Sequence, residues 1–409
     1  MDERFDFKSF EETLAQKGYL VFIREPAGLK NRCDLVAFGS DATGKATLSV
    51  FEFKVGANVN LDLEAAKLDA MRSETGADQC FLVSDDLIYR LSSDGFSLER
   101  ILEIPEIEKN GQLVTDDRIG FQLINQRISG HKLGEQIASI SKLLAELKFE
   151  DGLVIWDRPS IKMNGKTFRD AMIDIYRKRA SKLSGHNFAS RDVQYMIQNL
   201  LRAFTDVTDV FDPFFGLGFS SFSVAETMMS RSGGSAFKIR GIEINRQAVA
   251  EAEYLGQTFP KSVSIEIEVG DSLECQWPKT SLLVSELPLG VKLQKPFAIE
   301  DVTCTSIEEL ALLRAASSVR NGEISHGAIL ITSRGWLSKS SSKRLRDKLA
   351  EMRVVKGLIG LPPLHMPFTS IPLLLVILQR DSLEATTGEL GSDWKSHISG
   401  EKGNLYEIL

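Results

Sequence analysis

Two acidic residues and a lysine near the start of the chain have the types and spacing of a divalent-cation site. Glu52 and Lys54 stand two apart in the apolar run LSVFEFKV, so both side chains point to one face of a strand. Asp34 begins the earlier run CDLVAF, and the turn-rich GSDATGK between the runs predicts a hairpin that brings Asp34 beside Glu52. Such carboxylates can bind Mg²⁺, and the lysine can orient water and stabilise phosphate charge. Glu11, on an expected preceding helix, is a candidate third carboxylate.

The plain alternative is a half-exposed strand on which Glu52 and Lys54 simply face solvent. The elements expected around them favour a site. Phe51 and Phe53 alternate with the charged pair and fill the opposite face of the strand. We expect, in order, a helix at 7–17, strands at 19–23, 33–38 and 48–55, another helix, and an apolar strand at 79–83.

This order of helix, strands and Glu-x-Lys motif resembles the PD-(D/E)xK nuclease superfamily over residues 7–100, and most closely the nuclease domains of restriction enzymes. The resemblance implies that Asp34 and Glu52 bind Mg²⁺ and that Lys54 is the catalytic lysine. It also implies DNA as the substrate.

A second set of residues suited to ligand binding lies in the C-terminal half. A strand leads into DPFFGLG and then a helix, and such a turn needs glycines so that the backbone can approach a ligand. The next strand, in FKIRGIEIN, ends at Glu243, where a carboxylate accepts hydrogen bonds from ribose hydroxyls. Asp271 and Ser272 follow the third strand, at the sheet edge where ligands bind in doubly wound folds.

The strands after Ser272 predict how this sheet ends. SLLVSE and GAILITS are expected to be its fourth and fifth strands, with a helix between them. VVKGLIGLP and SIPLLLVILQR follow, and the short PPLHMPFT between them leaves no room for a crossover helix. We therefore expect a terminal antiparallel hairpin, which distinguishes a class I methyltransferase sheet from a dehydrogenase sheet.

The motifs over residues 185–380 resemble the N6-adenine DNA methyltransferases, specifically the modification subunits of type I restriction systems. GHNFASRDV, DPFFGLG, GIEIN, GDS and LIGLPPLHMPFTSIPLLLVIL match that family in order and spacing. Phe215 and Leu217 replace small residues of its glycine turn. The resemblance implies an S-adenosylmethionine pocket lined by Phe188, Asp212, Phe214, Gly216, Gly218, Glu243, Asp271 and Ser272.

The turn at which that family transfers the methyl group is altered. There it reads Asn/Asp-Pro-Pro-Phe/Tyr, and here it reads Glu286-Leu287-Pro288-Leu289. Glu286 is one methylene longer than aspartate, and Leu289 cannot stack on a flipped adenine as an aromatic ring does. We therefore expect methyl transfer to adenine to be lost.

Two basic stretches are candidates for DNA contact. Residues 177–182 end an expected helix, and 333–356 hold Arg334, Lys339, Lys343, Arg344 and Arg346 with two acids only. The alternative for each is a solvated helix face. Because the net charge is −7, DNA contact must come from such local patches.

The chain totals narrow the class of protein. It has 409 residues and no apolar run of the ~20 residues that a membrane span needs. Its four scattered cysteines form no CxxC pair, which favours a reducing cytoplasm. We expect a nuclease-like domain at 1–110, a mostly helical connector at 111–184, a methyltransferase-like α/β domain at 185–381 and a tail at 382–409. About thirty residues follow the last expected strand, so target recognition is expected from a partner protein.

Three functions follow in order of preference. The first is a Mg²⁺-dependent DNA endonuclease of restriction or defence type, whose methyltransferase-like half is an inactive scaffold for DNA or S-adenosylmethionine. The second is a non-catalytic subunit that senses DNA or S-adenosylmethionine. The third is an active N6-adenine DNA methyltransferase.

Overall fold

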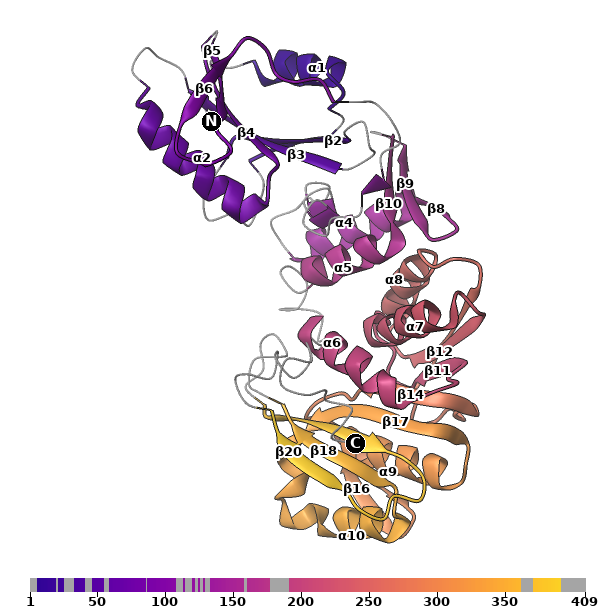
Figure 1. Cartoon of the computed structure of the whole chain (residues 1–409). Coiled ribbons are helices and arrows are strands. Elements are labelled where there is room, and N and C mark those ends of the chain that lie inside the picture. The colour runs from indigo at the N-terminus through magenta and orange to yellow at the C-terminus, as the bar shows by residue number, and fades with distance from the viewer. Residues whose placement is uncertain are drawn as a thin grey trace. The chain divides into compact units, whose positions relative to one another are not determined.

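A computed structural model gives the structure of the protein. It describes residues 6–19, 21–25, 33–40, 46–54, 59–85, 87–107, 113–114, 120–121, 124–125, 128, 133–157, 160–176, 191–361 and 371–390. The chain divides into two compact units, Met1–Ile175 and Tyr176–Leu409, each of which is described by itself (Figure 1). In the described part of the chain, no helix is long and apolar enough to cross a membrane.

A six-stranded sheet forms the first part of unit 1, and its strands lie side by side in chain order. They are β1 (Val21–Arg24), β2 (Leu35–Ser40), β3 (Ala46–Lys54), β4 (Gln79–Ser84), β5 (Leu87–Leu91) and β6 (Leu98–Ile101). Neighbours pair antiparallel except β3 and β4, which are parallel because α2 (Leu61–Thr75) connects them. With α1 (Phe7–Gln16) before β1, the predicted order of helices and strands is confirmed.

Alternation along β3 assigns its two faces to different helices. Phe51 and Phe53 point to the α1 side, where Phe7 meets Phe53 edge-on at 5.0 Å between ring centroids. Phe10 meets both rings in the same way. Glu52 points to the other face, where it bonds to Lys67 of α2. Both faces of the sheet are thus packed, and the charged pair lies on the α2 side, beyond the buried Val50 on the same face of β3.

Local capping fixes the ends of α2. Asn60 accepts a hydrogen bond from the Leu63 N–H at the start of the helix. Gly76 ends it at φ +68°, a left-handed conformation that glycine adopts without the steric penalty of a side chain. These caps set the length and position of the helix that carries Lys67 across the sheet.

The remainder of unit 1 contains more strand than the sequence pattern predicted. A four-stranded sheet has the order β7 (Leu113–Val114), β10 (Ser160–Asn164), β9 (Leu153–Asp157) and β8 (Lys148–Glu150). It accompanies α4 (Leu133–Glu146) and α5 (Gly165–Ile175), which were expected within the helical connector. The basic residues 177–182 lie outside the described residues.

Unit 2 is built on an eight-stranded sheet in the order β13-β12-β11-β14-β17-β19-β18-β20. Its strands are β11 (Asp209–Asp212), β12 (Phe237–Glu243), β13 (Val263–Val269), β14 (Thr280–Glu286), β17 (Ile324–Ser333), β18 (Val355–Gly360), β19 (Leu373–Leu378) and β20 (Thr386–Glu389). The first five in that order are parallel, and β19 runs antiparallel to both β17 and β18. The predicted mixed α/β sheet with a reversed terminal hairpin is confirmed.

Helices connect these strands. They are α6 (Arg191–Leu200), the short helix Leu201–Ala203, α7 (Phe219–Ser232), α8 (Arg246–Gly256), α9 (Ile307–Arg320), two short helices at Arg334–Leu337 and Ser340–Ser342, and α10 (Lys343–Met352). A two-stranded hairpin, β15 (Lys292–Ile299) and β16 (Val302–Ser306), interrupts the path from β14 to α9. The apolar core of this part packs α9 and α10 against the sheet, with Leu312, Leu313 and Val376 fully buried.

Candidate functional sites

The antiparallel register of β2 and β3 places Asp34 opposite Glu52. Leu35 pairs with Phe51, so the next position along the hairpin sets Asp34 against Glu52. Asp34 Oδ2 accepts a hydrogen bond of 2.9 Å from the Phe53 N–H, which fixes the Asp34 side chain at the end of the ladder. The strand pairing thus makes the two predicted residues neighbours across the hairpin.

Glu52 is buried, with 4% of its surface exposed, and it is held by two ammonium groups. Lys54 Nζ lies 3.1 Å from Glu52 Oε1, and Lys67 donates to that same oxygen. Lys54 also lies 3.5 Å from Glu64 Oε1 on α2. Burial lowers the pKa of Lys54, but its hydrogen bond to Glu52 and the charges of Glu52 and Glu64 outweigh burial and raise that pKa. Lys54 therefore stays protonated at neutral pH.

The second oxygens of both glutamates are buried without a partner. Glu52 Oε2 and Glu64 Oε2 accept no hydrogen bond from any described residue. A buried carboxylate oxygen left unpaired is costly, and a hard cation is the kind of ligand that removes the cost. The donor set of Asp34, Glu52 and Glu64 therefore fits Mg²⁺ in its chemistry. Among the described residues, however, no three metal-binding side chains already stand in a geometry that holds an ion.

Glu11 does not join this site, contrary to expectation. Its two oxygens bind the Arg24 guanidinium at 2.7 and 2.8 Å. The physical reason is the pleat of β3, because α1 packs on the face of Phe51 and Phe53 and Glu52 points to the other face. Glu64 and Lys67 of α2 contact Glu52 and Lys54 instead. Their spacing of three residues on a helix after the Glu-x-Lys strand is the sequence signal that could have identified them.

In unit 2, three carboxylates end three neighbouring parallel strands. Glu243 ends β12, Asp212 ends β11 and Glu286 ends β14. The sheet order reverses direction between β11 and β14, and ligands of doubly wound sheets bind at that point. Burial raises the pKa of Asp212 to about 7; hydrogen bonds from Ser285 and the Phe214 N–H lower it, and the charges of Glu286 and Glu243 raise it.

The glycine turn after β11 is tied to Glu243. Gly216 and Gly218 adopt φ of +54° and +78°, and Glu243 Oε2 accepts from the Gly216 N–H at 2.8 Å. Its other oxygen accepts from the Asn245 N–H at 2.8 Å. A Cβ added at Gly216 would meet no atom within 4 Å, so the turn borders open space there. An open glycine turn beside a strand-end carboxylate fits the ribose of S-adenosylmethionine.

The bulky residues of this turn point inward. Phe215 is 3% exposed, and a Cβ on Gly218 or Gly241 would collide with its ring. Its ring also packs edge-on against Phe222 at 5.8 Å. Phe215 thus fills space beneath the turn that Gly218 and Gly241 leave vacant.

The other expected cofactor residues differ in their surroundings. Asp271 caps its own loop by accepting from the Leu273 N–H at 2.9 Å. Ser272 is buried, and its Oγ accepts from the Trp277 indole at 3.1 Å, so this hydroxyl supports the loop. Phe214 is partly buried against the core. Phe188 lies outside the described residues.

The turn at the end of β14 is built into the core. Ser285 donates to Asp212 Oδ1 at 2.6 Å, and Ser220 of α7 donates to Glu286 Oε1. Leu287 is 1% exposed, and its N–H donates to the Ile331 carbonyl at 2.9 Å. Leu289 is also buried, at 8% exposed, and Pro288 between them is half-buried. Neither leucine side chain is presented as a surface for a base.

Most of the expected DNA-contacting cations are already paired. Arg334 pairs with Glu389, Lys343 with Asp347 at 2.6 Å, and Arg344 with Glu351 at 3.0 Å. Arg346 donates to the Trp336 and Lys339 carbonyls, both at 2.8 Å. Within the described part of the chain, Lys339 alone of the five has its side chain exposed without a carboxylate or carbonyl partner. The solvated-face alternative therefore accounts for most of this patch.

Comparisons with known proteins find likeness in structure but not in sequence. No protein-family model matches the chain, and no curated protein matches it. A Listeria monocytogenes protein assigned to the class I S-adenosylmethionine-dependent methyltransferases shows 15% identity and a TM-score of 0.49, over 60% of this chain and 78% of its own. DrdV, in a complex with DNA, shows 9% identity and a TM-score of 0.48, over 98% of this chain and 56% of its own.

The methyltransferase subunit of a type I restriction-modification system from Streptococcus thermophilus shows 16% identity and a TM-score of 0.46, over 55% of this chain and 52% of its own. The chain thus spans little more than half the length of two of these three proteins.

Proposed function

We propose that the protein is a DNA-acting component of restriction or defence type, with a Mg²⁺-dependent endonuclease in unit 1. The observation that carries this proposal is Glu52, a buried carboxylate opposite Asp34. One of its oxygens contacts two lysines, and the other has no partner among the described residues. Further support comes from the order of helices and strands around it, which is the order expected from the sequence's resemblance to the PD-(D/E)xK nucleases.

The reaction would be hydrolysis of a phosphodiester. A water oxygen bonds to phosphorus, the bond from phosphorus to the leaving deoxyribose oxygen breaks, and that oxygen takes up a proton. Lys54 is held protonated by Glu52 and Glu64, so its role is to stabilise the phosphate charge rather than to accept a proton. Asp34, Glu52 and Glu64 would hold the divalent cation, which supplies further charge neutralisation when bound.

Cleavage of supercoiled plasmid DNA in Mg²⁺ or Mn²⁺ tests the proposal. We expect nicking by the wild-type chain and a loss of at least a hundredfold in Lys54→Ala. Lys142→Ala is the matched control, since Lys142 lies in an exposed ion pair elsewhere in unit 1. Equal activity in wild type and Lys54→Ala, or no cleavage with either ion on any DNA tried, would contradict it.

We propose that unit 2 is a methyltransferase-like module that does not methylate adenine and instead binds DNA or S-adenosylmethionine. Support comes from the open glycine turn tied to Glu243 and from the burial of Leu287 and Leu289. Target recognition would come from a partner protein. Transfer of labelled methyl groups to DNA by the wild-type chain, abolished in Glu286→Ala, would overturn this and favour an active methyltransferase.

A second candidate function is a non-catalytic subunit that senses S-adenosylmethionine. The observation favouring it is that Glu243 keeps further acceptor capacity after binding Gly216 and Asn245. Calorimetric titration with S-adenosylmethionine separates the candidates. Tight binding that is lost in Glu243→Gln, in a chain that cuts no DNA, would favour the sensing subunit.

A further inference from the structure

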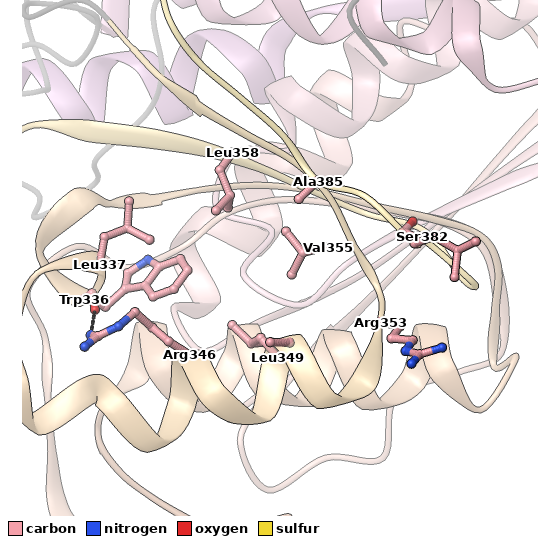
Figure 2. Close-up of a pocket in the computed structure, with 11 residues that line it drawn as sticks. Trp336, Leu337, Arg346, Leu349, Arg353, Val355, Leu358, Ser382 and Ala385 are labelled. Carbon is pink, nitrogen blue, oxygen red and sulfur yellow. Dashed lines mark hydrogen bonds between the residues drawn. The ribbon is translucent and has the colours of Figure 1, made fainter.

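A cavity of about 380 Å³ lies between α10, β18 and the chain that links β19 to β20. Its volume falls in the range of small-molecule sites. The walls are mainly apolar: Leu337, Leu349, Val355 and Leu358 line it (Figure 2), and Leu383 of the linking chain lies at its rim. Leu383 is 82% exposed, so the apolar lining continues to the open rim of the cavity. None of its lining residues belongs to the Glu52 site or the glycine turn, but Arg346 and Arg353 belong to the basic segment 333–356.

The charges at this cavity are all of one sign. Arg346 and Arg353 line it, no acidic side chain does, and Figure 2 shows the two guanidinium groups at opposite ends of the row of apolar residues. The Arg346 guanidinium is held by the Trp336 and Lys339 carbonyls. Among the described residues, Arg353 has no ion pair, and the Ser382 N–H bonds to its carbonyl, so Ser382 lies beside it. The Arg353 end can therefore accept an anion.

Two energetically unfavourable features lie at the cavity, one in the backbone and one in a side chain. Arg353 caps α10 at φ +52°, in a left-handed conformation that glycine usually supplies at this position. Trp336 is 5% exposed, yet its indole Nε1 has no hydrogen-bond acceptor among the described residues. A strained backbone and an unsatisfied buried donor are features that cluster at binding sites rather than in plain structural cores.

We propose that this cavity binds a small amphipathic anion, with the apolar body against Leu349, Val355 and Leu358 and the acidic group at Arg353. The class comprises aromatic or aliphatic carboxylates and sulfonates. Because the cavity is open at the Leu383 rim, the ligand enters without unfolding of α10. The site goes beyond the proposed nuclease function and holds whether or not the chain cuts DNA.

The test uses the full chain and two dyes that differ in charge. One is 8-anilino-1-naphthalenesulfonate and the other is N-phenyl-1-naphthylamine, its uncharged ring system. We expect saturable binding of both by fluorescence. Arg353→Gly should weaken binding of the sulfonate about tenfold, the loss of one charge-assisted contact, and leave the neutral dye unchanged. Glycine suits the left-handed position, so this variant is expected to fold.

Two further variants make the test decisive. Arg353→Lys keeps the charge, so its affinity for the sulfonate should stay within about threefold of wild type. That change is smaller than the one expected when a charge-assisted contact is lost. Ala385→Trp fills the cavity from its exposed edge and should abolish binding of both dyes. The proposal is overturned if Ala385→Trp binds both dyes as wild type does, if neither dye binds the folded chain saturably, or if Arg353→Gly leaves sulfonate binding unchanged. Competition by decanoate and by 1-naphthoate, measured against the sulfonate dye, then identifies whether the aliphatic or the aromatic class fits better.

Discussion

Lys54 Nζ lies 3.1 Å from Glu52 Oε1, on the same face of a single strand, and Lys67 reaches that oxygen from α2. One buried carboxylate therefore compensates two ammonium groups, which are about one third exposed. Removing the carboxylate leaves two like charges facing each other in a partly buried site.

Glu52→Ala is thus expected to lower the free energy of unfolding. Removing one partner of a fully buried pair costs about 3–5 kcal/mol. The exposure of both lysines reduces the expected loss to about 2 kcal/mol, since solvent screens charges at the surface. Urea denaturation followed by circular dichroism measures it. The double variant Glu52→Ala/Lys67→Met should recover part of the loss, and no recovery would show that charge repulsion is not the cause.

Metal binding should distinguish Glu64 from Glu11. Glu64→Gln removes a carboxylate whose Oε2 is buried without a partner, and we expect Mn²⁺ affinity to fall about tenfold. Glu11→Gln should leave affinity unchanged, because Glu11 is bound to Arg24. Titration with Mn²⁺ followed by electron paramagnetic resonance measures the metal affinity of both variants without any DNA. A larger loss of Mn²⁺ affinity in Glu11→Gln than in Glu64→Gln would show that Glu11, rather than Glu64, is the third carboxylate.

The stability of unit 2 should depend on pH through Asp212. Its pKa is raised by burial to about 7 in the folded chain, from an ordinary value of 3.8. The folded state thus holds a proton that the unfolded state releases between about pH 4 and 7. The stabilisation from this group is complete below about pH 4 and is lost as pH rises to about 7, at up to about 1.4 kcal/mol per unit.

Asp212→Asn removes this titration while keeping an oxygen that accepts from Ser285 and Phe214. Relative to wild type, it should therefore gain stability as the pH rises from 5 to 7.5. Urea midpoints at three pH values are sufficient to measure the trend. A constant difference between the two chains would mean that Asp212 is ionised throughout this range.

The basic segment should contribute to DNA binding mainly through Lys339. Each phosphate contact that is lost lowers the slope of log affinity against log salt concentration by about 0.9. Lys339→Ala should approach that value if the segment touches DNA. Lys343→Ala should change the slope less, since Lys343 already pairs with Asp347 at 2.6 Å. Equal slopes for wild type and Lys339→Ala would remove this segment from the DNA interface.

The elements that the sequence predicted well are those with a clear hydrophobic pattern. Alternation in LSVFEFKV predicted both faces of β3, and the strands of unit 2 are long apolar runs with clear turns between them. Glu64 and Lys67 were missed because helical spacing shows which residues share a face, but not which face meets the sheet. The β15–β16 hairpin was missed because most of β15 is exposed, so it lacks an apolar alternation.

Functional residues were harder to place than elements. Ser272 was expected from the family resemblance and Glu11 from its place on the first helix, yet Trp277 and Arg24 engage their side chains. The partners lie five and thirteen residues away along the chain, and no short motif records such pairings. The sequence thus predicted on which element each of these residues lies. It did not predict the side-chain partners, which determine what each residue is free to bind.

The Leu287 N–H bond to Ile331 is one that a proline at this position could not make. In the methyltransferases that this half resembles, a proline occupies the equivalent place, and proline has no N–H to donate. Leu287→Pro would remove a bond between the end of β14 and β17 and a leucine side chain from the core, so this variant should unfold at a lower urea concentration than wild type. Placing the proline of that motif here would therefore cost stability, whether or not it changed any activity.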